Sequence, residues 1–169
     1  MLRHPPGLWG SLAALRAHYP DGLAPRHVVW MWRRTLDLLA YVHGAGLAHG
    51  AIEPGHLLVQ PADHGIVLTG WARACQASDA ACARDLRQAA WSMRSLLGAD
   101  QHASARAPAL PSTLPAPLAA LLQRASEHDD GDASDSAARL LEASRASFGA
   151  ARFIVLATAP PHFTAALLR

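Results

Sequence analysis

Apolar residues recur every three to four positions in several segments of the chain, which is the spacing of amphipathic helices. This spacing predicts a short helix over residues 8–18, ended by the turn cluster "YPDG". A long helix is expected to begin at Pro25, because proline suits the first helical position, and to end at Gly44 and Gly46. Its apolar stripe consists of Val29, Trp32, Leu36, Leu39 and His43.

A change of pattern follows this helix. Two apolar, β-prone runs, "HLLVQ" and "IVLTG", flank the turn residues "PADHG" and predict a β-hairpin. A second long helix is expected from Asp79, as its N-cap, to Leu97. Residues 99–113 are rich in Ala, Ser and Pro and have the composition of an exposed loop. Two further helices are expected over residues 114–126 and 134–147, separated by the acidic turn "EHDDGD".

These elements predict a mainly α fold with one small β-hairpin. A chain of 169 residues is long enough for one domain with its own core and too short for two. We place the helical domain at residues 1–150. The tail, residues 151–169, begins with the apolar run "RFIVL" and is expected to pack on the domain as a strand.

The charge of the chain argues against nucleic-acid binding, because the formal net charge is only +2 and the arginines are scattered. All 15 basic residues are Arg, and the chain has no Lys and no Asn. It therefore has no Schiff-base amine, no ammonium group for phosphate and no Asn metal ligand. No apolar run reaches the about 20 residues of a membrane span, and the N-terminus is a poor signal peptide. We expect a soluble, cytoplasmic protein without membrane contact.

The stretch "LLAYVHGAGLAHGAIEPGHLLVQPADHGIVLTGWA" resembles the C-terminal lobe of bacterial Ser/Thr protein kinases. In that family a helix ending in Tyr-x-His precedes the catalytic loop H-R-D-x-K-P-x-N, and a hairpin then leads to D-F-G. Here Tyr41 and His43 match the helix end, "HGAIEPGH" occupies the catalytic loop, and "GWA" stands where D-F-G belongs. Asp85, in "ARDLRQAAWSMRSLLG", resembles the carboxylate that braces the loop. The resemblance spans residues 8–148 and implies a kinase-like C-lobe fold.

Four positions depart from the family's pattern where its chemistry takes place. Ala51 replaces the Asp that accepts the substrate proton, and Glu53 replaces the Lys that steadies the phosphoryl group. His56 replaces the Asn that holds magnesium, and Gly70 replaces the principal metal-binding Asp. Because phosphoryl transfer depends on positioning and charge neutralisation by these groups, the resemblance implies a pseudokinase without catalytic residues. We expect neither ATP nor magnesium to bind.

The framework positions of the family are retained. His49 matches the buried loop His, and Trp71 replaces the D-F-G Phe with another large aromatic residue. Leu57 and Leu58 match the apolar floor beneath the adenine ring, and Asp85 matches the carboxylate that accepts backbone N–H groups from the loop. We therefore assign structural roles to these five residues.

The resemblance also implies that the N-terminal lobe is absent, because about twenty residues precede the first long helix and no Gly-rich loop or strand Lys is present. The face that such a lobe would cover includes Leu8, Trp9, Leu57, Leu58 and Trp71. Left bare, this patch would be larger than monomers normally expose. We expect it to be covered by the tail from Phe153 onward, by a second copy of the chain, or by another protein.

The functional hypothesis is a catalytically inactive kinase-like domain that acts as a binding or scaffolding module. One alternative is a fragment of a larger Ser/Thr kinase-like polypeptide. Another is a diverged enzyme that uses His49, His56 and Glu53, together with Asp63, as acid-base or metal-binding groups. Cys75 and Cys82, the only cysteines, either pair in a disulfide or remain small thiols.

Overall fold

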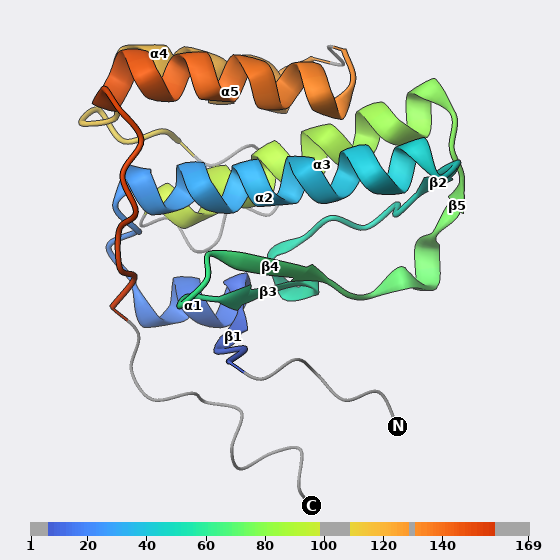
Figure 1. Ribbon diagram of the computed structural model, residues 1–169, viewed down its shortest axis with the longest axis horizontal. Coiled ribbons are helices and arrows are strands. Elements are labelled where there is room, and N and C mark those ends of the chain that lie inside the picture. Colours follow the sequence, from blue (N-terminus) through green and yellow to red (C-terminus); the bar gives the residue numbers. More distant parts are fainter. Residues whose placement is uncertain (1–6, 99–108, 129–130, 158–169) are drawn as a thin grey trace, which may run out of the picture.

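The computed structural model describes residues 7–98, 109–128 and 131–157, and in these ranges the protein is mainly helical. The α-helices of the described residues are α1 (Leu12–His18), α2 (Pro25–Gly44), α3 (Asp79–Leu97), α4 (Ala116–Glu127) and α5 (Ala133–Phe148). Helices α2 and α3 form a central layer (Figure 1). Helices α4 and α5 pack on one side of this layer, and α1 with the short strands lies on the other. Residues 99–108 of the expected loop lie outside the described ranges.

Helix α2 is buried on more than one side because it lies between the two outer layers. It begins at Pro25, as the sequence predicts. Trp32, Leu36 and Leu39 of the predicted stripe are buried, and so is Met31, which lies outside that stripe. Contacts with α5 on one side and with β4 (Gly65–Leu68) on the other account for the wider apolar surface. None of the described helices combines the length and apolarity that crossing a bilayer requires.

The predicted hairpin is present. Strand β3 (Leu57–Gln60) pairs with β4 in an antiparallel arrangement, with Leu57 opposite Leu68. A third strand, β1 (Gly10–Ser11), joins the other edge of β3 and sets Gly10 opposite Val59. The sheet order is therefore β1-β3-β4.

The expected start of the first helix is wrong. Gly10 and Ser11 form β1, and α1 begins only at Leu12. The side chain of Ser11 accepts a hydrogen bond from the backbone N–H of Ala14 at 3.2 Å, which makes Ser11 the N-cap. Pairing with β3 satisfies the backbone groups ahead of this cap, so the helix does not extend further back.

A second, two-stranded sheet joins the segments on either side of the hairpin. Strand β2 (Leu47–Ala48) pairs antiparallel with β5 (Cys75–Gln76), with Ala48 opposite Cys75. This pairing brings the loop that follows β2 close to the residues between β4 and β5. Cys75 and Cys82 are both free thiols.

The N-cap of α3 is Ser78 and not Asp79. The Ser78 hydroxyl accepts a hydrogen bond from the N–H of Ala81 at 3.3 Å. Asp79 is the first helical residue, where its carboxylate interacts favourably with the positive end of the helix dipole. The acidic turn provides the cap of α5, since Asp132 accepts from the N–H of Asp135 at 2.8 Å.

The tail does not form the expected strand over its described part, residues 151–157. It is nevertheless attached to the domain, because Leu156 is only 4% exposed and joins the hydrophobic core. Its backbone carbonyls bond to side chains and not to a neighbouring strand. His64 Nε2 donates to the Ile154 carbonyl at 2.7 Å, and the Tyr19 hydroxyl donates to the carbonyl of Ala157. Residues 158–169 lie outside the described ranges.

The face that includes Leu57 and Leu58 was expected to be covered by the tail, by a second copy of the chain or by another protein, but the chain's own N-terminal segment lies along it. Trp9, Leu57 and Leu58 are all buried. The pairing of β1 with β3 places residues 9–11 over this surface, and α1 packs on the same strand. Trp71, which lies beyond the hairpin, remains 42% exposed. The N-terminal segment, which was not among the three expected covers, therefore accounts for this burial within the described residues.

Candidate functional site

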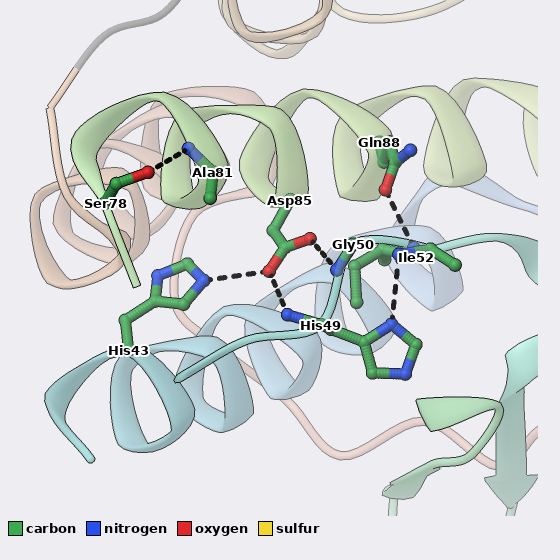
Figure 2. Close-up of polar contacts among 9 residues, drawn as sticks. His43, His49, Gly50, Ile52, Ser78, Ala81, Asp85 and Gln88 are labelled. Atoms are coloured by element: carbon green, nitrogen blue, oxygen red, sulfur yellow. Dashed lines mark hydrogen bonds and ion pairs between the residues drawn. The ribbon is translucent and has the colours of Figure 1, made fainter. Parts of the chain in front are cut away.

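Asp85 anchors the loop that follows β2 (Figure 2). It lies in the second turn of α3 and is fully buried. Its Oδ2 accepts a hydrogen bond from the backbone N–H of His49 at 2.7 Å, and its Oδ1 accepts from the N–H of Gly50 at 2.8 Å. His43, in the last turn of α2, donates from Nε2 to Asp85 Oδ2 at 3.1 Å. One carboxylate thus joins the two central helices and the loop.

These hydrogen bonds keep Asp85 ionised. Burial alone would raise the pKa of this carboxyl, because a charge is costly away from water. The hydrogen bonds from His43, His49 and Gly50 favour the charged form more strongly, and the pKa of Asp85 lies below its ordinary value. The buried charge is therefore satisfied by the fold itself.

Two more side chains of α3 form hydrogen bonds with the same loop. Gln88 Oε1 accepts a hydrogen bond from the backbone N–H of Ile52 at 2.9 Å (Figure 2). Ser92 Oγ donates to the carbonyl of Ile52 at 3.1 Å. Neither residue was predicted from the sequence. A signal was present, because positions 85, 88 and 92 are three and four residues apart and share one helix face.

His49 is buried, with a hydrogen bond at each ring nitrogen. Nδ1 accepts from the backbone N–H of Ala51 at 3.2 Å, so the ring proton is on Nε2, which bonds the carbonyl of Thr69 at 2.9 Å. Burial lowers the pKa of His49, and the nearby His56 contributes in the same direction, while bonds with Thr69 and Ala51 and the charge of Asp85 partly offset it. His49 is thus a neutral imidazole that connects the loop to the end of β4.

His56 fills the space beside Gly70. Its Nδ1 donates to the carbonyl of Ala51 at 2.9 Å, and its Nε2 lies 3.4 Å from Glu53 Oε1. Gly70 has φ +79°, and a Cβ at this position would lie 2.4 Å from Cδ2 and 2.6 Å from Nε2 of the His56 ring. Real Cβ atoms do not approach other atoms this closely. A side chain at position 70 would therefore require the His56 imidazole to move.

Trp71 packs against His49. The two ring centroids are 4.6 Å apart in an edge-to-face arrangement. The Trp71 indole Nε1 donates to the carbonyl of Leu68 at 3.2 Å, which ties this residue to the end of β4. Trp71 and Asp85 therefore both contact the 49–56 loop, as the sequence analysis expected of its framework residues.

The residues considered as acid-base or metal-binding groups do not form one cluster. His49 and His56 have ring centroids 6.1 Å apart, and Glu53 adjoins His56. Asp63 lies in the hairpin turn, where it accepts a hydrogen bond from Gln60 Nε2 at 2.9 Å. Within residues 7–98, 109–128 and 131–157, no three His, Cys, Asp or Glu side chains gather in a metal-binding arrangement.

The fold and the site define a mainly helical domain whose central loop is anchored on a buried carboxylate. No protein-family model matches the chain, and a search of curated proteins finds no match.

Proposed function

We propose that the chain is a degenerate, kinase-like C-terminal lobe that acts as a binding or scaffolding module and not as a phosphotransferase. The order of its elements supports this proposal. A long helix leads to the anchored loop, a hairpin follows, and a second long helix carries the anchoring Asp85. These are the elements and contacts that the resemblance implies.

The chemistry at the four departing positions supports an inactive protein. Ala51 has no group that accepts a proton, and Glu53 brings a negative charge where a cation would have to meet phosphate. His56 and Gly70 stand at the two positions expected to hold magnesium. Phosphoryl transfer depends almost wholly on such charges, so their loss removes the mechanism.

The contact between His56 and Gly70 is the observation that carries the proposal. The imidazole occupies the space that a carboxylate at position 70 would need. Its Nδ1 already bonds the Ala51 carbonyl, and its Nε2 faces Glu53. The space beside Gly70 is therefore occupied by an organised side chain.

The diverged-enzyme alternative receives less support. Both ring nitrogens of His49 are engaged in hydrogen bonds with the backbone, so this residue has no free position for proton transfer. Asp63 lies in the hairpin turn and bonds Gln60, apart from the pair formed by His56 and Glu53.

Incubation of the purified chain with γ-labelled ATP and magnesium tests the proposal. We expect no label on the chain itself or on a generic acceptor protein such as casein, under conditions in which an active kinase labels both. The proposal is wrong if label is transferred and a His56→Ala or Glu53→Ala variant abolishes the transfer. Label that persists in both variants identifies a contaminating kinase, and the transfer must then disappear on further purification. The coding region upstream, inspected for a Gly-rich strand pair, decides whether the chain belongs to a longer kinase-like polypeptide.

A further inference from the structure

A cavity of about 320 Å³ lies where the start of α2, the end of α5 and the tail meet. The tail passes the start of α2 on its way from α5 toward the hairpin (Figure 1). The hairpin turn contributes His64 to the wall, and the tail contributes residues 151–154. The volume is at the lower end of the range of ligand-binding cavities, about 300–1,000 Å³, so the cavity suits a small molecule.

Aromatic rings form much of the cavity wall. The ring of His64 lies between those of Trp30 and Phe153, with interplanar angles of 2° and 15° and centroids 4.2 and 4.1 Å away. Phe153 uses one ring face for this stack and is still 63% exposed. Phe148 adds a further ring from the end of α5. Because aromatic rings pack favourably on other rings, this wall favours an aromatic ligand.

The charged groups at the cavity favour an anion. Arg26 and Arg152 both line it, and none of its described lining residues is Asp or Glu. Arg26 Nη2 donates to the Phe148 carbonyl at 3.1 Å, and the guanidinium carbon lies 4.8 Å from the centroid of the Phe148 ring. Neither contact brings a carboxylate to Arg26. Arg152 is exposed and forms no ion pair with another described residue. Guanidinium groups bind carboxylates through two parallel hydrogen bonds.

The tail wall of the cavity is held in place by contacts with the rest of the domain. His64 Nε2 donates to the Ile154 carbonyl at 2.7 Å, and Arg34 Nε donates to the His64 carbonyl at 3.2 Å. Leu156, two residues further along the tail, is buried in the core. These contacts fix the tail against α2 and the hairpin turn, so little ordering would oppose binding.

We propose that this cavity binds a small aromatic carboxylate, a planar system of one or two rings that carries one carboxylate group. The ring packs against Phe148 and Phe153, and the carboxylate pairs with Arg152 and with the remaining N–H groups of Arg26. This inference goes beyond the proposed function and does not depend on it, because none of these residues stands at a motif position of the kinase resemblance.

Isothermal titration calorimetry of the full chain with β-naphthoate tests the inference. Two matched probes separate the charge from the ring. β-Naphthamide keeps the fused ring without the charge, and decahydro-β-naphthoate keeps the carboxylate on a saturated ring. We expect β-naphthoate to bind at least about tenfold more tightly than the amide, because charge-assisted hydrogen bonds are lost with the amide. It should bind at least about twofold more tightly than the saturated acid, which lacks aromatic packing.

Two substitutions at exposed positions test the location of the site. Arg152→Gln is expected to weaken β-naphthoate binding about tenfold or more, because it removes a charged partner. Phe153→Leu keeps an apolar side chain but removes the ring, and is expected to weaken binding about two- to tenfold. Arg145→Gln is the matched control, because Arg145 is an exposed arginine of α5 that does not line the cavity. It should bind like the unchanged chain, and circular dichroism with a thermal melt verifies that all three variants fold.

Three results would overturn the inference. The first is equal binding of β-naphthoate and β-naphthamide, including no binding of either. The second is equal binding of β-naphthoate and the saturated acid, which would indicate a general anion site. The third is an affinity in Arg152→Gln or Phe153→Leu equal to that of Arg145→Gln, which would place the ligand elsewhere. Phosphotransfer is measured separately, so each of these results leaves the inactive-lobe proposal in place.

Discussion

The imidazole of His56 lies against the backbone of Gly70, in the space that the Cβ of any other residue would need. This contact joins the end of the anchored loop to the segment after β4. A glycine is favoured here for two separate reasons. The backbone φ is +79°, which side-chain-bearing residues rarely adopt, and the His56 ring leaves no room for a Cβ.

We expect Gly70→Ala to lower the free energy of unfolding by about 2–4 kcal/mol, the sum of left-handed backbone strain and overpacking against His56. Urea denaturation measures this loss. Gly46→Ala is the matched control, because Gly46 has φ +81° and no atom within 4 Å of a built Cβ. It should cost only the backbone term, about 1–2 kcal/mol. Equal losses in the two variants would contradict the role assigned to His56, and adding His56→Ala to Gly70→Ala should recover part of the stability.

Asp85→Asn tests the anchor of the loop. The substitution keeps the shape of the side chain but replaces one acceptor oxygen with an NH₂ donor. The backbone N–H of either His49 or Gly50 then has no acceptor. Leaving a buried donor unsatisfied costs about 1–3 kcal/mol. Urea denaturation should show this loss, and hydrogen exchange should show faster exchange at the Gly50 amide.

Asp79→Asn provides the control for this experiment, since Asp79 is exposed in the first turn of the same helix. None of the hydrogen bonds described above joins Asp79 to the loop. It should leave the Gly50 amide protected. An Asp85→Asn protein as stable as the unchanged chain would show that the anchor is dispensable.

Stability should fall as the pH decreases from about 7 to 5. Burial lowers the folded-state pKa of both His49 and His27 below the ordinary value of 6.5, and His64 contributes at His27. Because the unfolded chain then binds protons that the folded chain does not, the stabilisation is complete above pH 6.5 and is lost below it. Thermal melts at successive pH values measure the slope.

His27→Gln should reduce the pH slope, because it removes one of the two groups. The Gln side chain also offers an oxygen for the Trp30 indole N–H, which donates to His27 Nδ1 at 3.3 Å in the unchanged protein. An unchanged slope in this variant would contradict the assignment. Asp85, whose pKa is also lowered, contributes a further loss only below its ordinary value of 3.8.

The tail is predicted to be part of the folded domain. His64 stacks between Trp30 and Phe153, with ring centroids 4.2 and 4.1 Å away, and Leu156 is in the core. Leu156→Ala should therefore cost about 2–4 kcal/mol in unfolding free energy. Val155→Ala, at the neighbouring position that is 79% exposed, should change it by less than about 0.5 kcal/mol. Similar small effects of both substitutions would show that the tail is detached in solution.

The candidate site could be predicted only in part. Asp85 was found from the sequence because a motif specified its position, and its hydrogen bonds to His49 and Gly50 are present. Gln88 and Ser92 were missed, because polar residues on a helix face are usually solvated and their partner, the backbone of Ile52, has no side-chain signature.

Elements whose signals are local could be predicted from the amino-acid sequence. Pro25 marked the start of α2, helical periodicity identified the long helices, and two β-prone runs around "PADHG" identified the hairpin. Proline geometry, helical period and turn chemistry act between near neighbours, so they can be read along the chain.

The contacts of the hairpin with β1 and of His56 with Gly70 depend on long-range packing and could not be predicted from local patterns. Gly10 and Ser11 pair with β3, whose Leu57 and Leu58 are buried, and His56 contacts Gly70 across the hairpin. The cavity beside Phe153 likewise forms between segments distant in sequence. Such contacts depend on how separate elements pack, and local sequence patterns do not specify which elements meet.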